Sequence, residues 1–471
     1  MRPGRPRLGR ALAVLGLCLA GLAGPAPAPR AQDTPETSVT LTVPQVRAAI
    51  AAAAQRGDGR IVRILARGLA ESGKADGQTY FLWAAAEERE GDPSVALDAA
   101  RQAYRLAGSD RQRFQAAQIA SRAAFAAEQP TTAQLWLRRT YQHTDDDAAR
   151  AAIAEDYRVL RAINPLSFQL TFGISPTSNV NNGADSRLNF IDGVPVVGIL
   201  SPTAQALSGV ELTGDLSLGY RLGELRRDRR ITAIGRLYTR QVRLSDEARA
   251  LAPTAENGDF AYTVVQAGVR AQFAREGGQR HGLGLVGGQS WYGGPKYFRF
   301  GRVEGDWSTR VAPGTRAGIA GYFEGRRYDA TGTSEDIAQI ALVLSHELPA
   351  GSQLRGRLAL QNTDATGMTR DNHAASLGLE WRPAGPVGPV SLSFGVSASY
   401  ADHPNYQVGF IAVPGGRQDK TVAAEVTVHF DRADYAGFIP TLDVGVRRTT
   451  SNVSRFDTRE MTVGFGIRSA F

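Results

Sequence analysis

The hydrophobic pattern of the chain changes once, at Ile163-Asn164-Pro165. Between residues 40 and 163, apolar side chains recur every three or four positions, as at Ile61, Leu65 and Leu69. This is the spacing of an amphipathic helix. Glycine, aspartate and proline interrupt the pattern at short intervals. Region 40–163 is therefore predicted to form a domain of short α-helices.

A repeat of helical pairs is indicated inside this region. Gly57-Asp58 recurs as Gly91-Asp92, and their separation matches the period of the tetratricopeptide helix–turn–helix unit. Ala96, Ala100 and Ala103 stand where a second helix must approach its neighbour closely. We expect three degenerate tetratricopeptide-like repeats and a closing helix at 146–163. An ordinary α-helical domain is the alternative.

After Pro165 the period becomes two. In Val422–Phe430, for example, valines and Phe430 share one face while Thr421, Glu425 and Thr427 share the other. Such alternation is typical of strands with one apolar face. Fourteen segments of this kind follow one another: 167–174, 209–220, 231–243, 259–273, 281–292, 297–310, 315–327, 335–347, 352–362, 372–382, 389–401, 419–431, 440–449 and 459–471.

An even number of long alternating strands predicts an antiparallel transmembrane β-barrel over 165–471, since about 9–11 residues suffice for a tilted strand to cross a bilayer. A soluble β protein of this length would divide into several sandwiches, and no linkers separate the segments. The polar face mixes both charge signs, which favours a watered lumen without strong ion selectivity. The predicted lumen-facing charges are Arg302, Glu304, Asp306, Arg355, Arg357, Glu380, Glu425 and Arg468.

The N-terminus has the three parts of a secretory signal peptide. Arginines precede an apolar run, Ala11 to Gly24, and small residues with prolines follow up to Ala31. The run is shorter than the roughly 20 residues of a spanning helix. We expect residues 1–31 to be removed on export. Cys18, the only cysteine, would leave with them.

Charge and residue types exclude several function classes. The formal net charge is +8, but five arginines precede Gln32 in a stretch that holds no acid, so the excess falls to +3 without them. This removes most support for nucleic-acid binding. A single cysteine excludes a disulfide framework and a cysteine-based metal site. The histidines are widely separated along the chain, and even the closest two, His403 and His429, are too far apart to form a metal-binding pair on one helix.

No catalytic motif stands in a suitable context. The sequence at 282–287 matches G-x-G-x-x-G, but it lies inside a predicted strand with no helix after it, so the phosphate-binding geometry is missing. A G-x-S-x-G motif does not occur. We expect no enzymatic activity, no cofactor and no metal site.

The last strand ends in a distinctive pattern. Val463, Phe465, Ile467 and Phe471 alternate with small or polar residues, and Phe471 is the last residue. This resembles the C-terminal signature of bacterial outer-membrane barrels. The resemblance implies that the barrel-assembly machinery inserts the chain.

Two further motifs carry a resemblance to a family. Gly173-Ile174-Ser175 leads into a loop containing Pro176, Ser178, Asn179, Asn181 and Asn182, and the C-terminal region reads Arg447-Arg448, Ser451-Asn452, Phe456-Asp457. With the signal peptide, short repeat domain and fourteen strands, the chain resembles the surface lipoprotein assembly modifier (Slam) family. The asparagines match the family loop, and we expect them to be structural, since asparagine tolerates left-handed backbone and caps turns.

The resemblance implies an outer-membrane translocon of Gram-negative bacteria, with its helical domain in the periplasm. Its partners would be a client surface lipoprotein, outer-membrane lipid and the barrel-assembly machinery, with no nucleic acid. Two alternatives are a polysaccharide-export porin with a periplasmic repeat scaffold and a passive outer-membrane anchoring protein. A porin for an anionic polymer would favour one charge sign in the lumen.

Overall fold

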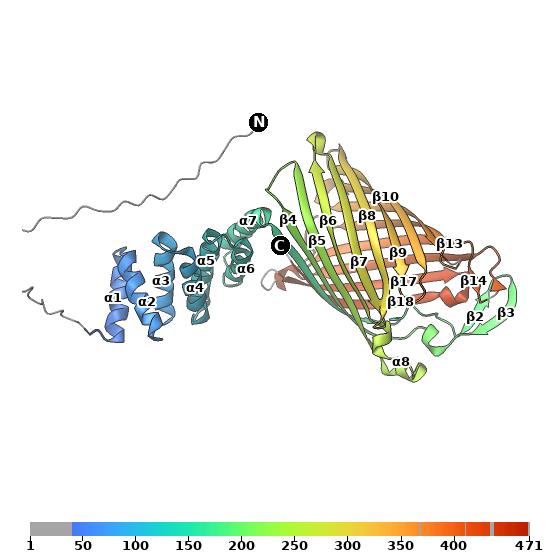
Figure 1. Cartoon of the computed structure of the whole chain (residues 1–471), viewed down its shortest axis with the longest axis horizontal. Coiled ribbons are helices and arrows are strands. Elements are labelled where there is room, and N and C mark those ends of the chain that lie inside the picture. Colours follow the sequence, from blue (N-terminus) through green and yellow to red (C-terminus); the bar gives the residue numbers. More distant parts are fainter. Residues whose placement is uncertain (1–39, 367–368, 410, 434–437, 470–471) are drawn as a thin grey trace, which may run out of the picture.

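The computed structural model describes residues 40–366, 369–409, 411–433 and 438–469. The predicted signal peptide and Phe471 lie outside the described residues. Helices from Val43 to Ile163 precede a closed antiparallel barrel of fourteen strands, which confirms the predicted fold class. Figure 1 shows the helices beside one end of the barrel.

Seven helices form the N-terminal domain. Their bounds are α1 (Val43–Gln55), α2 (Gly59–Glu71), α3 (Gly77–Glu90), α4 (Pro93–Arg105), α5 (Asp110–Ala126), α6 (Pro130–Gln142) and α7 (Asp147–Ile163). The step from the start of α1 to that of α3 equals the step from α2 to α4, whereas the step from α4 to α6 is slightly longer. Within the described residues no helix is both long and apolar enough to span a membrane.

Short polar side chains set where these helices begin. Asp58, Asp76, Asp92, Ser109 and Asp146 precede α2, α3, α4, α5 and α7, and each accepts a hydrogen bond from a backbone N–H in the first turn. Such N-caps satisfy donors that would otherwise have no partner inside the helix. The glycine–aspartate breaks seen in the sequence are therefore helix boundaries.

Alanine allows the helices to pack closely. Ala96 and Ala100 of α4 and Ala120 of α5 are fully buried, and Ala103 is nearly so. The first three share one core with Trp136 of α6. A larger side chain at these positions would force the helix axes apart, because protein cores have little free volume.

The barrel strands agree with the fourteen predicted segments to within a few residues at each end. Their bounds are β1 (Leu166–Thr177), β4 (Gly209–Leu222), β5 (Arg229–Leu244), β6 (Tyr262–Ala274), β7 (Arg280–Tyr292), β8 (Lys296–Ala312), β9 (Thr315–Tyr328), β10 (Ser334–Glu347), β11 (Gln353–Ala365), β12 (Asn372–Arg382), β13 (Ser391–His403), β16 (Arg417–His429), β17 (Phe438–Ser451) and β18 (Thr458–Ser469). Each pairs with its neighbours in chain order, and β1 pairs with β18 to close the barrel.

Apolar side chains cover the outer face of this barrel. Ile340, Leu342 and Leu344 of β10 are all more than half exposed, and Leu360 of β11 and Phe465 of β18 are similar. A soluble protein rarely leaves so large an apolar surface in water. A lipid bilayer is the environment in which this surface is stable.

The two ends of the barrel differ. At the end that carries the helices, β8 and β9 are joined by Pro313 and Gly314 alone, with Gly314 at φ +69°, a conformation that glycine adopts without steric cost. The opposite end has longer connections with structure of their own. They contain the hairpin β2 (Leu188–Ile191) and β3 (Val194–Ile199), the helix α8 (Asp246–Leu251), and the short strands β14 (Gln407–Val408) and β15 (Ile411–Ala412). The sequence pattern did not indicate these small elements.

Adjacent residues of β10 provide a test of the two faces. Leu342 points outward near the middle of the strand, while Val343 lines a cavity in the lumen. We expect Leu342→Arg to destabilise the barrel by about 2–4 kcal/mol in lipid vesicles, because the guanidinium would meet hydrocarbon. Val343→Arg places the same side chain in the lumen and should cost much less. Urea unfolding in vesicles, followed by tryptophan fluorescence, measures both, and equal losses would contradict the assigned faces.

Candidate functional site

The barrel encloses a polar lumen, and predicted charges line two of the cavities along its wall. The larger, about 930 Å³, lies toward the helical end and is lined mainly by β8, β9, β10 and β11. The second, about 630 Å³, is lined by β11, β12, β13, β16, β17 and β18. Arg355, Arg357 and Glu380 line both cavities. These three predicted residues thus lie where the two cavities meet.

The other predicted charges also lie on the inner face. Glu304 and Asp306 of β8 line the larger cavity, and Glu425 of β16 lines the second. Arg302 forms ion pairs with inner-face carboxylates, and Arg468 alternates with the outward Ile467. The eight charges therefore share one surface, but they do not gather into a single cluster.

A run of ion pairs crosses the inner wall from β6 to β8. Arg270 of β6 contacts Glu304, with its Nη1 2.5 Å from Oε1, and also pairs with Asp306. Arg302 lies between Glu304 and the next strand, with its Nε 3.4 Å from the Glu304 carboxylate. Each of these carboxylates therefore has an arginine partner on its own or a nearby strand.

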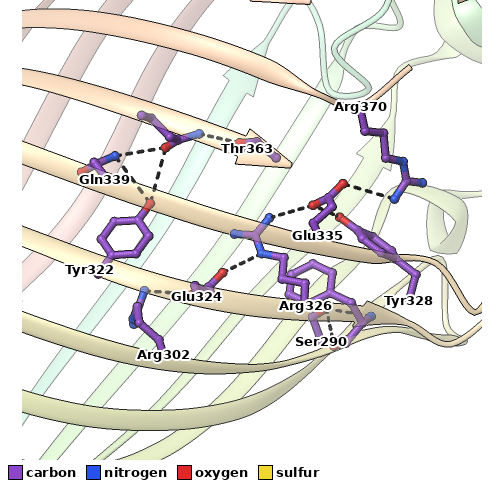
Figure 2. A network of polar contacts seen from close by, with 12 residues as sticks. Ser290, Arg302, Tyr322, Glu324, Arg326, Tyr328, Glu335, Gln339, Thr363 and Arg370 are labelled. Carbon is purple, nitrogen blue, oxygen red and sulfur yellow. Dashed lines mark hydrogen bonds and ion pairs between the residues drawn. The ribbon is translucent and has the colours of Figure 1, made fainter. Parts of the chain in front are cut away.

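The run continues over β9 and β10, as Figure 2 shows. Glu324, only 3% exposed, accepts from Arg326 at 2.6 Å and pairs with Arg302 at 3.4 Å. Glu335, 7% exposed, accepts a 2.7 Å hydrogen bond from the Tyr328 hydroxyl. Glu335 also forms ion pairs with Arg326 and Arg370, whose Nη1 atoms lie 3.8 and 3.3 Å from its carboxylate oxygens. Buried carboxylates of this kind are stable only with such partners.

Sequence reasoning named Arg302 and Glu304 but missed Glu324, Arg326 and Glu335. The alternation of β9 places Glu324 and Arg326 on the same face as Tyr322, so the sequence pattern could have predicted that these side chains point inward. Their partners were not, because pairing depends on the register between β8, β9 and β10. In that register Arg302 is opposite Glu324 and Glu335 is opposite Arg326.

The predicted loop motif ties the long connection after β1 together. The Asn179 side chain bonds Gly183 twice, accepting from its N–H at 2.8 Å and donating to its carbonyl at 2.9 Å. Asn181 donates to the carbonyls of Thr203 and Gln205 and accepts from the Leu207 N–H. Asn182 adopts φ +51°, the left-handed conformation that asparagine tolerates. These contacts hold the loop together.

Pro176 and Ser178 lie where β1 meets β18. Among the described residues, the pairing between these strands, here called the seam, runs over Phe172–Thr177 on β1 and Thr462–Ile467 on β18. By contrast, β1 pairs with β4 along its whole length. Pro176 has no N–H to donate within the seam, while Ser178 bonds Met461 just beyond it at 3.1 Å. Among the described residues, the seam has the shortest pairing of the barrel.

The helical domain is attached to β1, which forms one side of the seam, at the end of that strand opposite to Pro176. Only Asn164 and Pro165 separate α7 from β1. Asn164 is buried, donates to Thr131 and Gln134 of α6 at 3.0 Å, and accepts from the Leu166 N–H at 3.0 Å. This asparagine therefore binds the helical core and the first strand at the same time.

Two arginines add contacts between the domains. Arg221 of β4 donates to the carbonyl oxygens of Ala162 and Ile163 at 3.0 and 2.5 Å, capping the C-terminus of α7. Arg138 of α6 stacks over the ring of Phe438 on β17, at 5.2 Å from its centroid. The helices thus contact strands on both sides of the seam.

The C-terminal residues Val463, Phe465 and Ile467 point outward, at 38%, 59% and 46% exposure.

In the preceding connection, Asp457 accepts a 2.7 Å hydrogen bond from the Ser451 N–H. Burial nevertheless raises the pKa of the Asp457 carboxyl. Within the described part of the chain, no three histidine, cysteine, aspartate or glutamate residues are grouped to hold a metal ion.

No protein-family model matches the chain, and no curated protein matches it. Solved structures with a similar barrel include a bacterial polysaccharide outer membrane secretin (9% identity, 64% of this chain, 98% of that chain, TM-score 0.33). They also include Vibrio cholerae OmpT (9% identity, 65% of this chain, 98% of that chain, TM-score 0.33). A third is Pseudomonas aeruginosa OccK1 (10% identity, 64% of this chain, 98% of that chain, TM-score 0.32). Scores this low carry no conclusion about function. The closed even-stranded barrel with its apolar outer face itself defines the class, an outer-membrane-type β-barrel with an N-terminal helical domain.

Matched glutamate substitutions test the importance of the ion-pair run. Glu324→Gln removes the buried carboxylate between Arg302 and Arg326, which then keep their ion pairs with Glu304 and Glu335. We expect a loss of roughly 3 kcal/mol in the free energy of unfolding. Glu425→Gln is the control, since Glu425 also faces the lumen but has no ion pair among the described residues. Urea titration of the two variants in parallel checks this, and equal stability would show that the network contributes nothing.

Proposed function

We propose that this chain is an outer-membrane translocon that delivers lipoproteins, or similar exported proteins, to the cell surface. The observation that carries the proposal is the attachment of the helical domain to the strands around the seam. A client held by the helices would stand next to residues 166–171 of β1, for which no pairing with β18 is described. The resemblance of the Pro176–Asn182 loop to the Slam family supports the same function.

The two ends of the barrel support one orientation in the membrane. Outer-membrane barrels have short turns on the periplasmic side and longer loops outside. The helical domain joins the short-turn end, which supports a periplasmic position for it. Export by the predicted signal peptide would bring the chain to that compartment. Val463, Phe465 and Ile467, with Phe471, would then be recognised by the barrel-assembly machinery.

The paired charges of the lumen bear on the porin alternative. Arg270, Arg302 and Arg326 are each neutralised by a carboxylate. A pore for an anionic polymer would offer free charges of one sign. The wall between β6 and β10 therefore gives that alternative no support.

Protease shaving of intact cells tests the function. Candidate lipoproteins, beginning with any encoded beside this chain, would be co-expressed with it, and their surface exposure measured. We expect at least one to become protease-accessible, and to lose that exposure when residues 32–163 are deleted while the barrel still reaches the outer membrane. If no candidate gains exposure and none depends on the helical domain, the chain is not a translocon.

The route through the barrel can be tested separately with an engineered disulfide. Phe172 of β1 and Ile467 of β18 are directly paired, so their Cα atoms lie within disulfide range. With Cys18 removed in the signal peptide, Phe172→Cys with Ile467→Cys introduces the only thiols. If clients pass through the seam, oxidation should lower their surface exposure at least fivefold and reduction should restore it.

Leu342→Cys with Leu358→Cys is the matched control, since these residues are also paired and outward-facing, on β10 and β11. This disulfide should leave export unchanged. If the seam disulfide forms and export continues at the normal rate, clients do not pass through the seam.

A further inference from the structure

Aromatic rings follow the inner wall near the loop end of the barrel, away from the helical domain. Tyr262 at the start of β6 is directly opposite Tyr292 at the end of β7. The Tyr262 ring is 6.2 Å from that of Tyr238 on β5, and the Tyr292 ring is 5.8 Å from that of Tyr297 on β8. Four tyrosines from four adjacent strands thus form one surface.

These rings surround a cavity of about 630 Å³, here called the tyrosine cavity. Its lining consists of Tyr238, Arg240, Tyr262, Tyr292 and Tyr297. Binding cavities typically combine aromatic side chains with a few polar groups that orient the ligand. Tyrosine supplies both, because it carries a flat apolar ring and a hydroxyl.

Polar groups at the tyrosine cavity are free to bind a ligand. Within residues 40–366, 369–409, 411–433 and 438–469, the hydroxyls of Tyr238, Tyr292 and Tyr297 have no hydrogen-bond partner. The Arg240 Nε–H is buried and has no acceptor in the same part of the chain. Donors left without partners at a cavity favour a ligand rich in hydroxyl groups, which can both accept and donate.

The charge of the tyrosine cavity is neutralised from within the protein. Arg240 forms a 3.2 Å ion pair with Glu211 of β4 and donates to the carbonyl of Phe260 at 3.2 Å. An anionic ligand would have to compete with this carboxylate. The cavity therefore suits an uncharged ligand.

The ion-pair run holds one side of the tyrosine cavity in place. The Tyr297 ring packs edge-on against Tyr328, at 5.2 Å, and also contacts Phe298. Arg370 lies 4.2 Å over the Tyr328 ring, and Arg326 lies 4.8 Å over Phe298. Both arginines are fixed by Glu335. A rigid aromatic surface loses little conformational entropy on binding.

We propose that the tyrosine cavity binds an uncharged glycan chain. A pyranose ring has a flat face of C–H groups, which packs on an aromatic ring, and a rim of hydroxyls, which matches the free tyrosine hydroxyls. A polypeptide is the less suitable ligand, because β5 to β8 are paired on both sides and offer it no backbone hydrogen bonds. The site does not depend on the proposed translocon function.

Ligand binding to the full mature chain tests this site. The protein would be kept in an amine-oxide detergent, since detergents with sugar headgroups would compete for the cavity. Maltoheptaose, cellopentaose and xylopentaose are the probes, and an uncharged serine- and glutamine-rich peptide of similar length is the comparison. Saturation-transfer NMR detects binding and a titration gives Kd. We expect at least one glycan to bind and the peptide not to bind.

Three variants locate the binding. Tyr297→Ala should weaken glycan binding at least tenfold, and Tyr292→Phe, which removes only a hydroxyl, should weaken it a few-fold. Tyr400→Ala on β13 is the control, because Tyr400 is exposed on the outer face and should leave Kd unchanged. Heat-dependent gel migration verifies that each barrel is folded.

Two results would overturn the proposal: no detectable binding of any of the three glycans, or binding that survives both cavity substitutions. Binding of the peptide in place of the glycans would reassign the cavity to polypeptide. None of these outcomes affects the export measurement, so failure of the glycan site and failure of the translocon are distinguishable.

Discussion

The structure depends on the need to pair every backbone hydrogen-bonding group inside a bilayer. Lipid offers no partner for an N–H or a carbonyl, so a strand that crosses it must be paired on both edges. Closure of fourteen strands meets this requirement, with β1 and β18 as the final contact. That contact is also the shortest in the described part of the barrel, and Pro176 withholds one donor from it. Within the described residues, the strand pair that completes the barrel therefore has the fewest backbone pairs.

The helical domain is joined to β1, one of the two strands of this contact, with almost no linker between them. A flexible linker would let the two domains move independently, but α7 passes into β1 through Asn164 and Pro165 alone. Asn164 hydrogen-bonds α6 and the first residue of β1, so a tilt of the helices would pull on that strand. The helical core and the first strand of the seam are therefore directly joined in this architecture.

Alternation of apolar and polar residues was enough to predict the barrel, because lipid on one side and water on the other impose period two on every strand. All fourteen strands were found in this way, including the inward direction of Arg355 and Glu380. The small elements β2, β3 and α8 were missed, since loops outside the membrane carry no such pattern.

The Arg326–Glu335 pair was missed for another reason. It depends on which residues face each other across β9 and β10, and the register follows from the turn that joins these strands. The tetratricopeptide-like repeat stays a prediction. Asp58 and Asp92 cap α2 and α4 at the expected interval, whereas the longer α5 delays the start of α6.

The lumen network shows how a wet barrel can hold many charges and remain neutral over much of its wall. Separate charges would attract counterions and select one sign of solute, whereas the carboxylates between β6 and β10 share arginines with their neighbours. The pairs also cross-link adjacent strands from inside, which stiffens this half of the barrel. The seam lies on the other side of the closed strand order, beyond β4 in one direction and β17 in the other. The continuous run of ion pairs from β6 to β10 thus lies on strands that do not form the seam.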